Sequence, residues 1–136
     1  MRPAGVTIIA VLNWLRAALF ALGGMVLIAV GHLSGHMMTA LGGSPLAERL
    51  LSGIGKTLGL VGLLIAVLWL AAGVGLWGLK GWGRSLTLGL TGLWLFFGLF
   101  GLLHRPFPTH ILRLIVDAAI LVYLLTPDVK RLFEAA

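Results

Sequence analysis

The fold of this chain is decided by the stretch TLGLVGLLIAVLWLAAGVGLWGL (57–79), KGWGR (80–84) and SLTLGLTGLWLFFGLFGLL (85–103). Each long run is apolar over roughly 20 residues, the length that an α-helix needs to cross the hydrocarbon core of a bilayer. The connection 80–84 is so short that the two helices must be antiparallel neighbours. The middle of the chain is therefore predicted to be a helical hairpin that crosses a membrane twice.

Two further apolar runs, 5–31 and 109–126, flank this hairpin. With 60% hydrophobic and 10% charged residues in 136, the chain holds more apolar side chain than a soluble core of this size can bury. We therefore expect an all-α membrane protein with one domain, 1–136, and four transmembrane helices in an up-down-up-down bundle. Asn13 and Arg16 interrupt the first run, which argues against a cleaved signal peptide.

A short surface helix is predicted between the first and second spans. Ser44-Pro45 has the pattern of a helix start, because serine caps the first turn and proline tolerates it. Apolar residues then recur at helical spacing through 45–54. Such an amphipathic segment is typical of a helix that lies on the membrane surface.

The formal net charge of +6 does not indicate nucleic-acid binding, because the basic residues are scattered at the span ends, where lipid headgroups lie. Four crossings place both termini and the loop 80–84 on one side. That side carries Arg2, Lys80, Arg84, Lys130 and Arg131, and the other carries Arg49, Lys56, Arg105 and Arg113. The positive-inside rule then predicts cytoplasmic termini. The absence of cysteine excludes disulfides and thiol chemistry.

Two charges lie deep in the predicted spans, Arg16 and Asp117. Counted from the same membrane face at about 1.5 Å per residue, their depths match. An unpaired charge in hydrocarbon is costly, so we expect an ion pair between the first and fourth spans, with Asn13 as a secondary hydrogen-bond partner. Three alternatives remain: pairing of Arg113 with Asp117 along one helix, a proton or anion relay, and an acidic lipid or partner residue for Arg16.

Candidate cofactor ligands are His32, His36 and His104, all on the face opposite the termini. His32 and His36 are spaced to share a helix face, as haem, chlorophyll or metal ligands would be, although Gly31, Ser34 and Gly35 should weaken that helix. Solvated or headgroup-facing histidine is the simpler interpretation. No metal site and no cofactor is predicted.

Glycine at helix-packing intervals is predicted to let helices approach closely, at Gly59, Gly62, Gly75, Gly78, Gly89 and Gly92. These surfaces would pack within the chain or dock another subunit. Trp77 and Trp82 flank the 80–84 loop as predicted interface anchors. Deeper aromatic residues such as Trp94 and Phe97 would pack, or hold a carotenoid, quinone or acyl chain.

Three segments of the chain indicate a family resemblance, namely RPAGVTIIA (2–10), GLWGLKGWGR (75–84) and YLLTPDVK (123–130). In these segments it resembles small bacterial four-span membrane proteins of unknown function. The resemblance covers nearly the whole chain and implies a fold and an inner-membrane setting, with no activity to transfer. By size the chain is also similar to the small multidrug transporters. Their mechanism, however, needs an acidic residue in the first span, where this chain has Asn13 and Arg16.

The sequence contains no phosphate-binding glycine loop, no catalytic triad pattern, no paired carboxylates and no HExxH. We therefore expect a non-enzymatic protein, an accessory or structural subunit of a larger membrane complex of respiratory or photosynthetic type, whose partners are lipid and other subunits or itself. The alternatives are a small oligomeric transporter or channel that uses Arg16 and Asp117, and a histidine-ligated haem or chlorophyll carrier.

Overall fold

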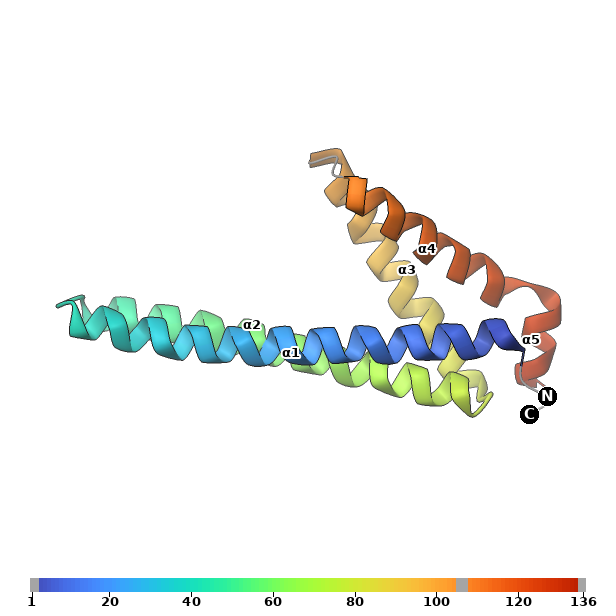
Figure 1. Ribbon diagram of the computed structural model, residues 1–136, viewed down its shortest axis with the longest axis horizontal. Coiled ribbons are helices and arrows are strands. Elements are labelled where there is room, and N and C mark those ends of the chain that lie inside the picture. Colours follow the sequence, from blue (N-terminus) through green and yellow to red (C-terminus); the bar gives the residue numbers. More distant parts are fainter. Residues whose placement is uncertain (1–2, 105–107, 135–136) are drawn as a thin grey trace. The chain divides into compact units, whose positions relative to one another are not determined.

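The computed structural model describes residues 3–104 and 108–134, and the side chains of these residues outside 102–110. Within that part of the chain, five helices follow one another without a strand: α1 (Ala4–Ala40), α2 (Pro45–Trp77), α3 (Gly81–His104), α4 (Pro108–Leu125) and α5 (Pro127–Glu134) (Figure 1). The prediction of an all-helical protein is confirmed.

Three stretches in the described residues are long and apolar enough to cross a membrane, namely α1, α2 and Gly81–Gly101 of α3. Their large apolar side chains are mostly exposed, for example Leu64 at 65% and Leu19 at 61%. Lipid can cover such surfaces, which water cannot do without cost. The predicted fourth span falls on α4, which has 18 residues and whose first side chains lie outside the described set.

The ends of α1 and α2 share one type of turn. After α1, Gly43 N–H donates to the Met38 carbonyl at 2.8 Å and Gly42 N–H donates to Thr39. After α2, Lys80 N–H donates to the Gly75 carbonyl at 2.9 Å and Leu79 N–H donates to Leu76. Both are Schellman caps, which need one residue with a positive φ.

That residue is Gly42 in the first cap, with φ 77°, and Leu79 in the second, with φ 53°. Glycine adopts this conformation freely, whereas a side chain makes it unfavourable. The sequence places glycines at 78 and 81, on either side of the position that needs one.

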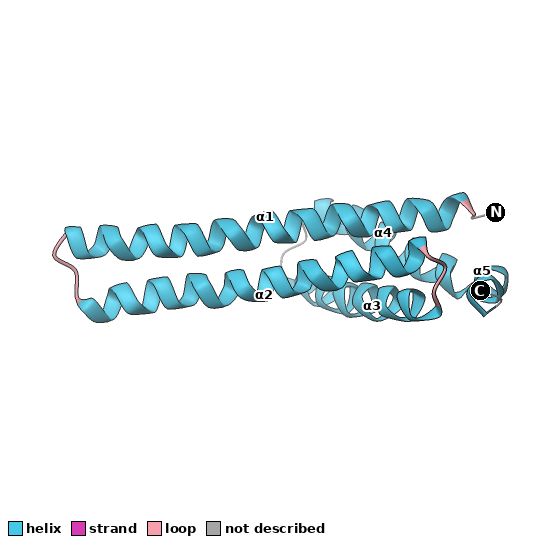
Figure 2. Ribbon diagram, turned by 90° about the horizontal axis from the view of Figure 1, so that it is seen from below, coloured by secondary structure: helices cyan, strands magenta, loops and turns pink. Residues whose placement is uncertain are grey.

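The structure divides into two compact units, residues 14–70 (the hairpin unit) and Met1–Asn13 with Ala71–Ala136 (the core unit). In the hairpin unit, α1 and α2 run antiparallel and are joined by a short loop (Figure 2). They meet at glycines: a Cβ added to Gly31 would lie 2.7 Å from the Gly55 Cα, and one added to Gly24 would lie 2.7 Å from the Gly59 carbonyl oxygen. The contact is therefore made by backbone.

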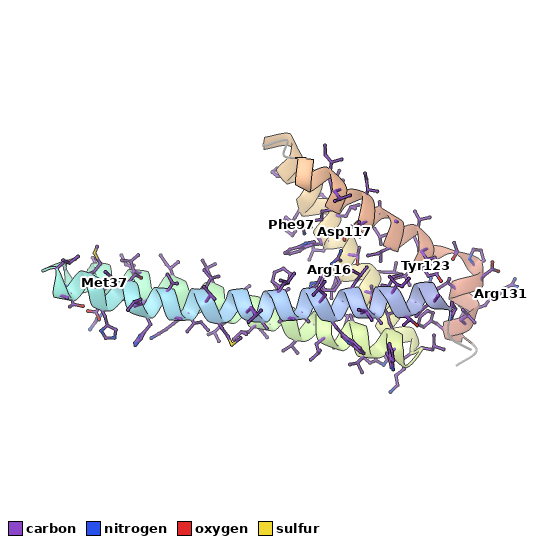
Figure 3. The ribbon with its side chains drawn as sticks, viewed as in Figure 1. Arg16, Met37, Phe97, Asp117, Tyr123 and Arg131 are labelled. Atoms are coloured by element: carbon purple, nitrogen blue, oxygen red, sulfur yellow. The ribbon has the colours of Figure 1, made fainter. Side chains whose placement is uncertain are left out.

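Apart from one glycine contact, the helices of the core unit meet through side chains. A buried cluster joins the start of α1, the end of α2, α4 and α5: Val6, Ile9, Ala10, Leu76, Ile120, Leu124, Val129 and Phe133. α3 packs on α4, and Gly83 near the start of α3 lies against Gly75 of α2. The tyrosine ring of Tyr123 fills the space beside Gly5, so that any side chain at position 5 would displace it (Figure 3).

Two expectations about the first connection are wrong. The segment 45–54 is helical, but it is not a separate surface helix, because α2 continues without a break from Pro45 to Trp77. α1 also continues through Gly31, Ser34 and Gly35 to Ala40. The physical reason is the close contact between the two helices: Gly31 lies against Gly55, and Gly35 lies against Glu48 and Ser52. Tertiary packing thus outweighs the low helix propensity of glycine.

The start of α2 is the part of this region that was predicted correctly. Ala47 N–H donates to the Ser44 hydroxyl at 3.2 Å, so Ser44 is the N-cap and Pro45 occupies the first turn. This arrangement satisfies a backbone donor that the helix itself cannot satisfy.

Candidate functional site

The most polar part of the apolar core unit is a group of buried side chains on three helices. Asn13 of α1, Thr87 and Thr91 of α3, and Asp117 of α4 are each 0% exposed. Buried polar groups in a membrane helix are costly and so are candidates for a functional role. We call these four residues the polar group.

One hydrogen bond in the polar group joins α1 to α3. The Asn13 amide Nδ2 donates to Thr87 Oγ1 at 3.1 Å, and Thr87 Oγ1 in turn donates to the Gly83 carbonyl at 2.8 Å. Thr87 therefore acts as acceptor and donor at once. Its hydroxyl is held in one orientation, which fixes the position of the Asn13 amide.

Two oxygens of the polar group have no hydrogen-bond partner among the described residues: Oδ1 of Asn13 and Oγ1 of Thr91. Thr91 follows Thr87 by one helical turn, so both hydroxyls lie on the same face of α3. These two oxygens could therefore still accept hydrogen bonds, and they lie in a segment where water is scarce.

Asp117 has a cation on its own helix. Arg113 Nε lies 3.7 Å from Asp117 Oδ2, and the Arg113 guanidinium carbon lies 4.8 Å from the centre of the Trp94 ring. The carboxylate side chain is 1% exposed, whereas that of Arg113 is 42% exposed. The competing arrangement that the sequence left open, pairing along α4, is therefore present in the structure.

A small cavity of about 150 Å³ lies beside this arginine. Its walls are Trp94, Phe97, Gly98 and Gly101 of α3, together with Arg113 of α4. Aromatic rings at this depth were expected to pack or to hold an acyl chain or pigment. The cavity is large enough for a few methylene groups.

Arg16 belongs to the hairpin unit, where its guanidinium carbon lies 4.9 Å from the centre of the buried Trp69 ring. A cation over an indole face is an attractive contact in a membrane, since it needs no second charge. The ion pair predicted between Arg16 and Asp117, with Asn13 as helper, joins residues of different units and stays a prediction.

The structure brings His32 and His36 together on α1, with their Nε2 atoms 3.2 Å apart and their rings edge to face at 4.5 Å between centroids. Ligands on opposite sides of a haem iron would be about 4 Å apart with the iron between them, so this pair cannot supply both axial ligands. The side chain of the third candidate, His104, lies outside the described residues.

The predicted packing glycines separate into three sets. Gly59 and Gly62 of α2 lie against Gly24 of α1, and Gly75 lies against Gly83. Gly78 is in the turn after α2 and has only local neighbours. For Gly89 and Gly92 of α3, an added Cβ would meet no atom within 4 Å.

The two predicted anchors flank the same turn. Trp77 at the end of α2 is 38% exposed and Trp82 at the start of α3 is 49% exposed. The Trp82 ring also lies against Gly75. Their anchoring in the headgroup region stays a prediction.

Sequence reasoning missed three features of the core unit. Arg84, assigned to a charged loop, donates from Nε to the Leu124 carbonyl at 2.9 Å and so caps α4. Thr87 was not recognised as the partner of Asn13. No helix was predicted after Pro127, whereas α5 lies there and buries Val129 and Phe133. Their spacing of four residues after a proline at the first turn could have indicated a helix.

A family model described as "Predicted membrane protein (DUF2127)" matches residues 5–127. The chain belongs to this family. The match covers the helices from the start of α1 to the end of α4 and confirms the resemblance to small membrane proteins of unknown function. The chain matches no curated protein, and it matches no solved structure.

Proposed function

We propose that this member of the DUF2127 family is a non-enzymatic accessory subunit that docks on a larger assembly in the bacterial inner membrane. The observation that carries the proposal is the open small-residue face of α3, formed by Ser85, Gly89 and Gly92. A Cβ added to either glycine would meet no atom within 4 Å, and Ser85 is exposed.

The contrast with four glycines of α1 and α2 supports this role. Gly24, Gly31, Gly55 and Gly59 are each in contact with another helix, which is the use that glycine has in membrane helices. Glycine lowers helix stability by about 1 kcal/mol relative to alanine, so a glycine pair on an uncovered face costs stability without return unless another helix covers it.

The proposal includes a topology. α4 has 18 residues, which at about 1.5 Å each spans about 27 Å, close to the thickness of the hydrocarbon core. If it crosses, four spans place both termini in the cytoplasm together with Lys80, Arg84, Lys130 and Arg131. Reporter fusions at the two ends test this arrangement, and ends on opposite sides would contradict it.

The deciding experiment is purification from native membranes after mild crosslinking. We expect larger membrane subunits to co-purify at fixed stoichiometry with the wild-type chain, and to be lost from the variant with Gly89→Leu and Gly92→Leu. Gly23→Leu is the matched control, because Gly23 also has nothing within 4 Å but lies on α1. A chain that purifies alone, or a double variant that keeps its partners, would refute the accessory role.

A second candidate is a small transporter or channel, which the polar group favours. Asn13, Thr87, Thr91 and Asp117 place one carboxylate and several oxygens in the buried part of the core unit. In membrane helices such residues mark ion and proton paths. Proton- or cation-driven flux in liposomes that Asp117→Asn abolishes would favour this function, and flux equal to that of empty liposomes would exclude it.

A further inference from the structure

The histidines of α1 form a side-chain pair that neither the proposed docking role nor the family description uses. His32 and His36 are both exposed and stand one helical turn apart. Their Nε2 atoms are separated by 3.2 Å, and the ring planes are at 89° to each other. The two Nε2 atoms are within hydrogen-bond distance of each other, so the two ring nitrogens lie close together beside the helix.

This separation is the one that a metal ion requires of two neighbouring ligands. Imidazole nitrogen binds Zn²⁺ at about 2.0–2.1 Å, so two such nitrogens at a tetrahedral angle lie about 3.3 Å apart, and at a right angle about 2.9 Å apart. The observed 3.2 Å falls between these values. We infer that His32 and His36 form a two-histidine binding site for a divalent transition metal ion of the Cu²⁺ or Zn²⁺ type.

The imidazole ligands limit which metal ions can bind at this site. Imidazole suits Cu²⁺, Ni²⁺ and Zn²⁺, whereas Mg²⁺ and Ca²⁺ prefer oxygen. Among the described residues, no third histidine, aspartate or glutamate completes a cluster with this pair. The remaining coordination positions would therefore be taken by water, and Cu²⁺ should bind most tightly because it stands highest in the Irving–Williams order.

The register of the hairpin unit places the site at its charged end. Gly31 lies against Gly55 and Gly35 lies against Glu48, so in this antiparallel pair His32 is slightly nearer the loop than Lys56. Charged residues avoid the hydrocarbon core, which makes Lys56 a marker of its edge. His36 lies a further turn toward the loop, where α2 carries Glu48 and Arg49. A metal ion can thus reach the pair from water.

The site joins two turns of one helix and does not bridge α1 to α2. Binding would hold the segment around 32–36 helical, next to Gly31, Ser34 and Gly35, where helix propensity is low. Met37, which projects outward close to the pair, is 57% exposed and provides a control position in the same segment (Figure 3).

The test is a Cu²⁺ titration followed by electron paramagnetic resonance. It uses the full chain in detergent micelles, with an amino-terminal tag free of histidine and with His104→Gln and His110→Gln as the background. We expect one Cu²⁺ per chain with two imidazole nitrogens in its spectrum. Either His32→Ala or His36→Ala should leave one nitrogen and raise the Kd at least about tenfold, because the second ligand of a chelate binds at high effective concentration.

Met37→Ala should change neither the spectrum nor the Kd, and circular dichroism of each variant shows that the helices are retained. Fewer than two imidazole nitrogens in the background protein would overturn the inference. So would a Kd that stays the same when both histidines are replaced, since copper would then bind elsewhere. Failure here would leave the docking of α3 unaffected, because the two proposals concern different helices.

Discussion

In the hairpin unit, α1 and α2 touch backbone to backbone at glycine, whereas the core unit has one such contact, between Gly75 and Gly83, and otherwise packs through large side chains such as Leu76 and Leu124. The difference teaches how a small membrane protein can hold helices together in two ways. Lipid tails are as apolar as leucine, so burying leucine gains little hydrophobic free energy, and close van der Waals contact must supply the attraction. In the hairpin unit, glycine allows this contact because it has no side chain. In the core unit, large side chains make the contact by filling the space between the helices.

The comparison predicts opposite sensitivities. In the hairpin unit, adding a side chain to a contact glycine should lower the free energy of unfolding. In the core unit, removing a buried side chain should lower it. Three polar contacts belong to the core unit, namely the Asn13–Thr87 bond, the Arg113–Asp117 pair and the Arg84 cap, whereas in the hairpin unit Arg16 lies over the Trp69 ring. Four predictions test these differences, and they are given from the largest expected effect to the smallest.

Asp117→Leu should lower the free energy of unfolding by about 4 kcal/mol, because it leaves a buried or half-buried cation without its carboxylate. Adding Arg16→Leu should recover much of the loss if the predicted pair joins the two units. Adding Arg113→Leu should recover little, since its side chain is 42% exposed and exposed pairs contribute about 1 kcal/mol or less. No recovery from adding Arg16→Leu would mean that Arg16 is not paired with Asp117. Unfolding in mixed detergent micelles measures the free energy of unfolding of the wild type, the single variant and the two double variants.

Leu124→Ala should cost about 3 kcal/mol, because the side chain is 0% exposed and its removal leaves a cavity in the core unit. Leu125→Ala is the control, since that neighbouring side chain is 59% exposed and has no packing to lose. The same unfolding measurement applies. Similar losses from both variants would show that Leu124 is not part of a packed core.

Gly55→Leu should cost about 2 kcal/mol, because its Cβ would lie 2.6 Å from the Gly31 Cα and would push α1 and α2 apart. Gly53→Leu, two residues earlier, meets nothing within 4 Å and adds the same apolar surface. Energy transfer between probes on α1 and α2 would report the separation. If the Gly53 variant is as unstable as the Gly55 variant, helix contact is not the cause.

Leu79→Gly should stabilise the cap of α2 by about 1 kcal/mol, because glycine relieves the positive φ there, while the contact of the leucine side chain with the buried cluster is lost. Gly42→Ala should destabilise it by a similar amount, since it introduces the same strain into the cap of α1. Hydrogen exchange at the amides of Lys80 and Gly43 follows each cap separately. Shifts of the same sign in the two variants would contradict the shared Schellman geometry.

Much of the fold could be predicted from the sequence. The apolar runs predicted helices of membrane-spanning length, and Ser44-Pro45 predicted the start of α2. The helix boundaries around the first connection could not be predicted, because Gly31 and Gly35 are poor helix formers when considered alone. Only their contact with Gly55 and Glu48 makes a continuous helix favourable there.

The candidate site shows the same limit. The sequence singled out Asn13, Asp117 and the His32/His36 pair from residue type and spacing along one helix. It could not find Thr87, because a threonine in an apolar run looks like many others until α3 places it 3.1 Å from the Asn13 amide. Nor could it separate Gly59, which has a helix against it, from Gly89, which has none.

The sequence by itself determined that this protein is helical and suited to a membrane, because helix length and hydropathy are local properties that each segment carries. Tertiary structure alone decided which glycines are covered, which carbonyl Arg84 caps and which hydroxyl Asn13 binds. These depend on atoms that meet from distant parts of the chain, where a shift of one helical turn exchanges one partner for another.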